Sequence, residues 1–200
     1  GTVVAGKYQV EKLIARGGFS SVYRARQIGM ERDVAIKVLE IDSSVDGTTL
    51  ERFVREARLV SQLSHPNTIT IYDFGRSGTD FLYIVMEHVK GRSLSRQVRK
   101  YGPLHAADAA RVALDILKSL EEAHRLGILH RDMKPSNIML GRDHEDALTV
   151  RVLDFGIAKI LDPMPDMSTA LTQQGVFVGT PRYAAPEQMK REEMTLFTMN

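Results

Sequence analysis

The stretch ILHRDMKPSNIML, residues 128–140, places an acid, a base and an amide in one short loop between two apolar runs. Asp132 can accept a proton or orient a hydroxyl, and Lys134 can neutralise a phosphoryl group in transfer. Asn137 offers an amide oxygen, a hard ligand that suits Mg²⁺. Each residue alone is explained by a polar loop side chain that bonds to the backbone. All three in this order indicate a site for chemistry.

A further carboxylate follows downstream. VLDFG, residues 152–156, presents Asp154 at the end of an apolar strand and just before a glycine. A carboxylate and an amide oxygen, completed by substrate phosphates and water, are the usual way in which proteins hold Mg²⁺. We therefore expect Asp154 and Asn137 to act together.

Hydrophobic periodicity predicts strands in the first half of the chain and helices in the second. The expected strands cover residues 8–15, 22–28, 34–40, 68–74 and 81–88. An amphipathic helix is expected over residues 48–63. A longer helix is expected over 105–126, with one apolar face made of Ala109, Val112, Ala113, Ile116, Leu117 and Leu120. The change near Gly91 predicts two lobes, and the lack of periodicity after residue 157 is typical of a functional loop.

Composition excludes several classes of protein. The 43% hydrophobic and 26% charged residues are ordinary for a globular protein. The formal net charge of +2 is too even to favour nucleic acid or an anionic membrane as partner. The chain has no cysteine, so disulfides and thiolate metal sites are excluded. The longest apolar run, residues 81–86, is far shorter than the roughly 20 residues of a membrane helix.

Two features of the first half have both a structural and a functional interpretation. IARGGFSSVY, residues 14–23, puts glycines in a turn between strands, where backbone amides can approach phosphates, although most such turns are plain hairpins. Lys37 in VAIK either extends along an apolar strand to water or is held in a cleft. Glu56 lies near the apolar face of the following helix, so the two charges either pair or are both solvated.

Together, VAIK (34–37), HRDMKPSN (130–137), DFG (154–156) and APE (185–187) resemble the protein kinase signature set in its expected order. The resemblance runs from Tyr8 to Glu187 and is greatest to the eukaryote-like serine/threonine kinases of bacteria. It implies an α+β, two-lobed protein kinase fold. An N-lobe of antiparallel sheet plus one helix would span residues 1–90 and bind nucleotide. A mainly helical C-lobe would span 91–200 and be incomplete.

The resemblance also implies a role for each matching residue in a non-specific serine/threonine protein kinase. Lys37 would hold the α- and β-phosphates of ATP and be positioned by Glu56. Asp132 would act as the catalytic base or hydroxyl orienter, and Lys134 would stabilise the γ-phosphate. Thr180 would support the catalytic Asp and line the groove for protein substrates.

The same resemblance implies the ligands of both cofactors, Mg²⁺ and ATP. Asn137 and Asp154 would bind Mg²⁺. Met86 would be the gatekeeper, with Glu87 and Val89 giving backbone hydrogen bonds to adenine. The ring would lie between Val22, Ala35 and Met139, and the phosphates under Ile14, Ala15, Arg16, Gly17, Gly18, Phe19, Ser20 and Ser21.

Regulation is also implied. Because Arg131 lies next to the catalytic Asp, the chain resembles kinases that are switched by phosphorylation of the activation loop. A phosphate on that loop could pair with this Arg. Self-association would then allow one copy to modify another at Ser168, Thr169 or Thr172, with Thr172 as first choice. His130 would be structural and pack against Phe155, and a catalytic role for it is the alternative.

Two departures from the family pattern stand out. Ala15 and Ser20 replace the outer glycines of the phosphate loop, so this loop should be stiffer. The chain stops at Asn200, before the later helices of a kinase C-lobe, and it begins without Met. We therefore expect a kinase-domain fragment that is inactive or weakly active alone, with apolar faces of the 105–126 helix exposed.

Two other functions fit the same sequence. A pseudokinase or scaffold would bind nucleotide and partners without transfer, which the presence of the full catalytic set argues against. A small-molecule phosphotransferase of similar fold is the other, and GTPRYAAPE, residues 179–187, argues against it because it resembles a platform for protein substrates. The need for ATP and the lack of a signal pattern predict a cytoplasmic location.

Overall fold

The computed structural model describes residues 1–17, 20–41, 47–78, 81–156 and Tyr183. The first part of the chain forms a six-stranded antiparallel sheet in the order β1-β2-β3-β4-β6-β5. Its strands are β1 (Val3–Val4), β2 (Tyr8–Arg16), β3 (Ser20–Gln27), β4 (Arg32–Glu40), β5 (Ile71–Ser77) and β6 (Phe81–Glu87). The strands predicted from apolar alternation and β-branched runs are confirmed, with shifts of one to three residues at most ends.

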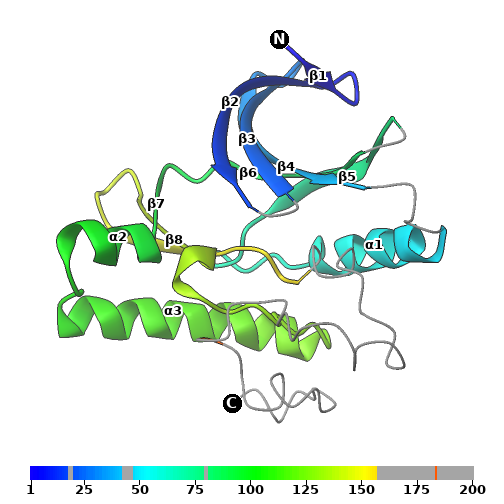
Figure 1. The fold of residues 1–200 in the computed structure, drawn as a ribbon. Helices are drawn as coiled ribbons and strands as arrows, with labels where there is room; N and C mark the ends of the chain where they lie inside the picture. Colours follow the sequence, from blue (N-terminus) through cyan, green and yellow to red (C-terminus); the bar gives the residue numbers. More distant parts are fainter. Residues whose placement is uncertain (18–19, 42–46, 79–80, 157–182, 184–200) are drawn as a thin grey trace, which may run out of the picture.

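This sheet curls over a small core of its own (Figure 1). The core consists of Tyr8, Ala25, Val34, Ile36, Tyr83 and Val85, all buried. Register shifts between Val10 and Lys12 and between Leu13 and Ala15 interrupt the pairing of β2 with β3. Such irregularities increase the twist of a strand pair, which is consistent with the strong curl at this edge of the sheet.

Helix α1 (Gly47–Val60) lies below the sheet in Figure 1. Phe53, Ala57 and Val60 are buried at helical spacing, as the predicted amphipathic pattern requires. The helix ends three residues earlier than the pattern suggested. Leu63 is nevertheless buried, because the turn after the helix keeps this side chain in the main core.

The second part of the chain holds two helices and a three-stranded sheet in the order β7-β8-β9. Its elements are β7 (Gly91–Ser93), α2 (Leu94–Tyr101), α3 (Ala106–Arg125), the 3-10 turn η1 (Pro135–Asn137), β8 (Ile138–Arg142) and β9 (Leu148–Val152). Helix α2 was not predicted. The hydroxyl of Ser93 accepts a hydrogen bond from the backbone N–H of Arg96 at its start, and Gly102 ends it at a φ of 84°.

The apolar face predicted for α3 is buried only in part, and the expected exposure of apolar residues on this helix is confirmed. The buried residues are Val112, Asp115, Ser119 and Ala123. Leu117, on the predicted apolar face, is 61% exposed, and Leu114 is also exposed. The buried face carries two polar residues because both have partners: Asp115 pairs with Arg111 and Lys118, and the Ser119 hydroxyl lies 2.7 Å from that of Thr68.

The two parts are joined through the segment between α1 and β5. The backbone N–H of Ile69 donates to the Val152 carbonyl at 3.0 Å, and the N–H of Val152 donates to Asn67 at 2.7 Å. The resulting core contains residues from both parts, such as Phe53, Ile84, Val112 and Phe155. Across the described stretches of the chain, no helix has both the length and the apolar character to cross a membrane.

Candidate active site

A cleft of about 240 Å³ lies where the curled sheet meets the second sheet. Nine residues predicted to bind nucleotide or metal line it: Ile14, Val22, Ala35, Lys37, Met86, Glu87, Val89, Met139 and Asp154. Ile69, His88, Lys90, Gly91 and Leu153 also line this cleft and were not predicted. They belong to linking segments whose path is set by the packing of the two sheets, which no local pattern in the sequence reports.

The hairpin between β2 and β3 lies at the mouth of this cleft. Ala15 pairs with Val22 and Arg16 with Ser21 across the two strands, and the N–H of Gly17 donates to the Ser20 carbonyl at 2.7 Å. Of the hairpin residues predicted to contact nucleotide, Ile14 and Val22 line the cleft and these others do not. Gly18 and Phe19 lie outside the described residues.

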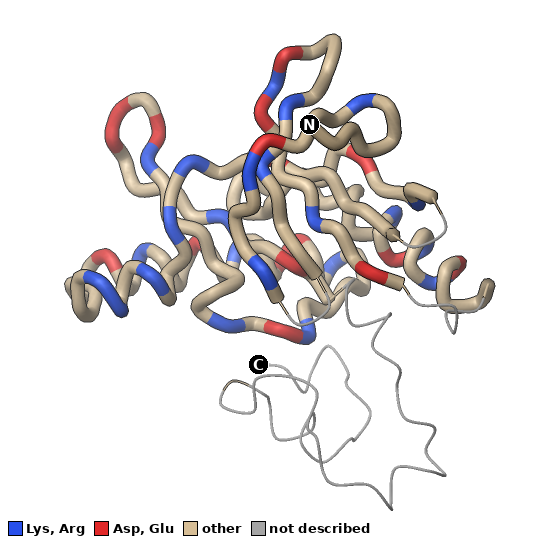
Figure 2. Tube along the Cα trace, turned by 45° about the horizontal axis from the view of Figure 1, so that its top comes forward, with Lys and Arg blue, Asp and Glu red and all other residues tan. Residues whose placement is uncertain are grey.

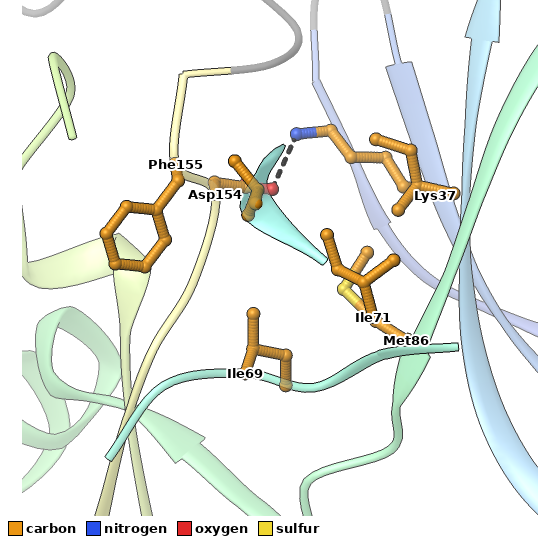
Figure 3. A pocket seen from close by; sticks show the side chains of 8 residues that line it. Lys37, Ile69, Ile71, Met86, Asp154 and Phe155 are labelled. Carbon is orange, nitrogen blue, oxygen red and sulfur yellow. Dashed lines mark hydrogen bonds and ion pairs between the residues drawn. The ribbon is translucent and has the colours of Figure 1, made fainter. Parts of the chain in front are cut away.

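Lys37 is buried in the middle of β4, with Val22 and Ile84 as its strand neighbours. Its Nζ lies 2.8 Å from Oδ1 of Asp154, and a dashed line marks this ion pair in Figure 3. A buried ammonium is costly unless it is paired, so this contact compensates the burial of the Lys37 charge. The pair links the curled sheet to the segment after β9, across 117 positions of sequence.

The expected ion pair between Lys37 and Glu56 is not formed. In the described residues the ion-pair partner of Lys37 is Asp154, and none joins it to Glu56, which is half-buried on α1. A small cavity of about 20 Å³ lies beside Lys37 (Figure 3), and Val60 of α1 is among the residues that line it. It has room for about one water molecule. The local sequence could not show which of two carboxylates, Glu56 or Asp154, pairs with Lys37, because the two belong to different elements.

The loop before η1 and η1 itself bring three predicted residues together. Nζ of Lys134 lies 2.7 Å from Oδ2 of Asp132. The side-chain amide of Asn137 donates to the same Oδ2 at 3.1 Å and to the Asp132 carbonyl at 2.9 Å. Because its nitrogen faces Asp132, the amide oxygen of Asn137 is directed away from this carboxylate. The loop therefore presents a carboxylate beside a cation, and a separate oxygen ligand.

The amide and carboxylate expected to bind Mg²⁺ are held by neighbouring segments. The N–H of Leu153, next to Asp154, donates to the Asn137 carbonyl at 2.8 Å. No group of three His, Cys, Asp or Glu residues that could hold a metal occurs among the described residues. One carboxylate and one amide oxygen fit Mg²⁺, which commonly takes one or two protein oxygens and completes its shell with phosphates and water.

Backbone geometry fixes both segments. Arg131 and Asp154 have φ values of 59° and 56°, in the left-handed region that residues other than glycine rarely adopt. Gly156 has a φ of 57°, and a Cβ there would lie 3.3 Å from the His130 carbonyl. Non-glycine residues in this region carry strain that the surrounding structure must hold, and such strain is concentrated at functional sites.

His130 supports both segments from below. Its ring is 1% exposed, and the ring centroid lies 4.7 Å from that of Phe155, as predicted. The N–H of Asp132 donates to Nδ1 at 3.3 Å, so Nε2 carries the proton and donates to the Leu153 carbonyl at 2.8 Å. Burial lowers the pKa of His130, against the raising effect of the Leu153 bond and of Asp154 and Asp132. The neutral ring positions the loop.

An ion pair of Glu87, which lines the cleft, was not predicted from the sequence. Arg151 of β9 lies 3.3 Å from Oε2 of Glu87, and the Glu87 N–H donates to the Thr70 carbonyl at 2.9 Å. The contact with Arg151 attaches the end of β6 to the second sheet, and the bond to Thr70 attaches it to the segment before β5. No sequence signal links positions 64 apart, and only the strand order brings them together.

Several predicted residues lie outside the described residues. They are Thr180, the candidate phosphosites Ser168, Thr169 and Thr172, and the APE motif at 185–187. Tyr183 alone is described beyond residue 156, and it is exposed.

A curled antiparallel sheet above a mainly helical part, with an ion pair of a buried Lys and an Asp in the cleft between them, is the two-lobed architecture of a protein kinase domain. Residues 8–197 match the protein kinase domain family, so the chain belongs to that family. The α+β kinase fold predicted from the sequence motifs is confirmed.

Curated relatives are bacterial serine/threonine kinases. The chain is 42% identical to serine/threonine-protein kinase pkn3 of Myxococcus xanthus over 97% of its length and 35% of the relative's. It is 40% identical to PrkC of Bacillus subtilis, over 95% of this chain and 28% of that protein. The chain thus spans about a third of the length of these relatives.

Solved structures of other proteins have a similar fold. The crystal structure of the Mycobacterium tuberculosis PknI kinase domain matches 98% of this chain and 69% of its own, with a TM-score of 0.75 and 25% identity. Rad53 in complex with AMP-PNP matches 92% of this chain and 43% of its own, with a TM-score of 0.72 and 25% identity.

Proposed function

We propose that this chain is the nucleotide-binding and catalytic part of a serine/threonine protein kinase that transfers the γ-phosphate of ATP to protein hydroxyls. The observation that carries the proposal is the grouping around Asp132, whose carboxylate is held by Lys134 and by the amide of Asn137. The relatives described above, pkn3 and PrkC, are both named serine/threonine kinases, which supports the same activity.

ATP would occupy the cleft between the two sheets. The apolar side chains of Val22, Ala35 and Met139 suit the faces of a flat adenine ring, and Lys37 suits its phosphates. The similar structure of Rad53 is a complex with AMP-PNP, which supports a nucleotide as the ligand. We also propose the division into lobes at 1–90 and 91–200, since the six-stranded sheet ends at Glu87 and the next sheet begins at Gly91.

In the proposed reaction, the hydroxyl of a Ser or Thr substrate donates to Asp132, which orients it and takes its proton. The hydroxyl oxygen forms a bond to the γ-phosphorus while the bond to the β–γ bridging oxygen breaks, and ADP leaves. Lys134 would neutralise charge on the transferred group. Bound Mg²⁺, held by Asn137 and Asp154, would neutralise charge on the phosphates.

Binding of phosphates and metal would compete for both members of the Lys37–Asp154 pair. Asp154 would turn to the metal and Lys37 to the α- and β-phosphates, and Glu56 could then take its proposed place beside Lys37. Phosphorylation of Ser168, Thr169 or Thr172 by a second copy, with Arg131 as the cation, remains a proposal about regulation. A cytoplasmic location rests on the ATP requirement alone.

The test is phosphate transfer by the complete natural protein and its Asp132→Asn variant. With Mg-ATP and a mixed Ser/Thr protein substrate, we expect the variant to lose about 10²–10⁴-fold in kcat, because the hydroxyl orienter is gone. Asp108→Asn, an exposed acid in the first turn of α3, is the matched control and should keep the activity. Nucleotide binding with no transfer by the parent protein would instead indicate a pseudokinase.

A further inference from the structure

Helix α2 carries a concentration of positive charge that the proposed reaction does not use. Residues 88–107 contain five of the 27 Lys and Arg of the chain and none of its 25 Asp and Glu, so the other 180 residues have 22 basic and 25 acidic residues. We call Arg92, Arg96, Arg99 and Lys100 the α2 basic surface. All four are exposed, and Figure 2 shows positive positions along α2 at the left of the molecule.

The stability of α2 does not explain these charges. Cations in the last turn of a helix interact favourably with its dipole, which accounts for Arg99 and Lys100. Arg96, however, lies in the first turn, where a cation is unfavourable, and Arg92 lies before the helix. Within the described stretches, none of the four forms an ion pair; Arg99 donates weakly to Ser95 at 3.5 Å.

The acidic turn after β8 does not pair with the surface either. The nearest acidic turn along the paired strands follows β8, and its charges are used locally. Asp143 accepts bonds from the N–H groups of Glu145 and Ala147, and Asp146 pairs with Arg142.

Tyr101, at the end of α2, lies beside two cations of this surface. Its ring lies 4.8 Å from the Arg92 guanidinium and 5.0 Å from the Lys100 ammonium. Hydrogen bonds from Lys100 and Arg92 to the hydroxyl hold the pKa of Tyr101 below its ordinary range. The same two cations would stabilise a carboxylate from another molecule at this place.

The α2 basic surface borders a groove that leads to the catalytic loop. The groove encloses about 500 Å³, and its lining includes Leu94, Val98, Arg99, Leu104, Pro135 and Tyr183. Pro135 follows Lys134 directly and begins η1, against which α2 packs. A polypeptide whose hydroxyl lies at Asp132 therefore passes beside this groove.

We propose that the α2 basic surface selects protein substrates with acidic residues close to the phosphorylated Ser or Thr. This inference rests on the proposed kinase function. Charge complementarity supports an acidic occupant, and the apolar floor of Leu94, Val98 and Leu104 suits one apolar side chain beside the acids. The eight residues of α2 span about 12 Å, which an extended peptide crosses in about four residues. The acids should thus lie about two to five positions from the hydroxyl.

The experiment compares kcat/KM of the complete natural protein on two synthetic peptides that share one Ser. One peptide carries Asp and Glu at two to five positions on either side of the Ser, and the other carries Asn and Gln there. We expect the acidic peptide to be preferred by about five-fold at low salt, mainly through KM, because two or more exposed charge pairs form. The preference should weaken as salt screens these charges.

The variant Arg96→Gln with Arg99→Gln should remove this preference, since Gln keeps the helix propensity but not the charge. Lys12→Gln with Arg125→Gln removes the same charge from exposed positions elsewhere and should keep the preference. Equal rates on both peptides by the parent protein would overturn the inference and leave the kinase function standing. Absence of transfer to either peptide would overturn both. Equal rates together with binding to phosphatidylserine vesicles, lost in the α2 variant, would assign the surface to a membrane instead.

Discussion

At the scale of single residues, the His130 ring connects the loop that carries Asp132 to the segment that carries Asp154. It accepts from the Asp132 N–H and donates to the Leu153 carbonyl, and both bonds require the neutral tautomer with the proton on Nε2. Protonation of Nδ1 would break the first bond and place an uncompensated charge in a buried site.

The pH dependence of stability should report this ring. Burial lowers the pKa of His130 from its ordinary 6.5 in the folded state, so the unfolded chain binds more protons below that pH. The free energy of unfolding should be constant above about pH 6.5 and fall below it, by at most about 1.4 kcal/mol per pH unit. Urea unfolding between about pH 7.5 and 5.5 measures this.

A control is needed because burial also lowers the pKa of His88. The His88→Gln variant removes that contribution and should still lose stability over the same pH range. A variant whose stability stays flat over that range would contradict the role assigned to His130.

At the scale of elements, α3 is attached to the turn after α1 by one carboxylate. Glu122 accepts from the N–H groups of Ser64 and His65 and from the Ser64 hydroxyl, at 3.0–3.2 Å. Burial acts to raise the pKa of Glu122, but the N–H donors of His65 and Ser64 outweigh it and lower the pKa. These bonds hold the turn after α1, from which the chain continues into the segment that joins the two parts of the molecule.

Glu122→Gln should therefore destabilise the fold by about 1–2 kcal/mol, because the replaced oxygen had charge-assisted bonds to backbone N–H groups. Glu121→Gln on the same helix is the matched control. Glu121 is exposed and pairs only with Arg125 among the described residues, so its replacement should change stability by less than about 0.5 kcal/mol. Guanidinium unfolding compares the two, and equal effects would mean that the bonds to Ser64 and His65 contribute nothing.

At the scale of the whole molecule, the Lys37–Asp154 pair joins the two parts of the chain. Both residues line the cleft that is proposed to bind ATP. A ligand that binds there stabilises the folded state by mass action. Mg-ATP at about 100 times its Kd should add about 2.7 kcal/mol to the free energy of unfolding.

Lys37→Gln should abolish most of this ligand-induced stabilisation, because the buried ammonium is the cation proposed for the phosphates. Lys12→Gln, at an exposed position of β2, is the control and should retain the full shift in Tm. The measurement is thermal unfolding with and without Mg-ATP. A Lys37→Gln protein that Mg-ATP stabilises as much as the parent would contradict the proposed phosphate contact.

The sequence by itself determined the family, five of the six strands of the first sheet, helices α1 and α3, and the loop that we propose is catalytic. This was possible because these features depend on residues close together in the chain. Asp132, Lys134 and Asn137 lie within six positions, so the loop that holds them can be predicted from local sequence. Apolar periodicity likewise predicted α1, because its buried residues are all apolar.

Only the tertiary structure decided which charges meet and which face of α3 is buried. Lys37 pairs with Asp154 across 117 positions and Glu87 with Arg151 across 64, and the path of the chain between them sets both contacts. On α3, Asp115 is buried because its partners on the helix compensate its charge, which hydrophobic periodicity does not register. The physical reason is that pairing energy depends on distance in space, whereas a sequence pattern reports only distance along the chain.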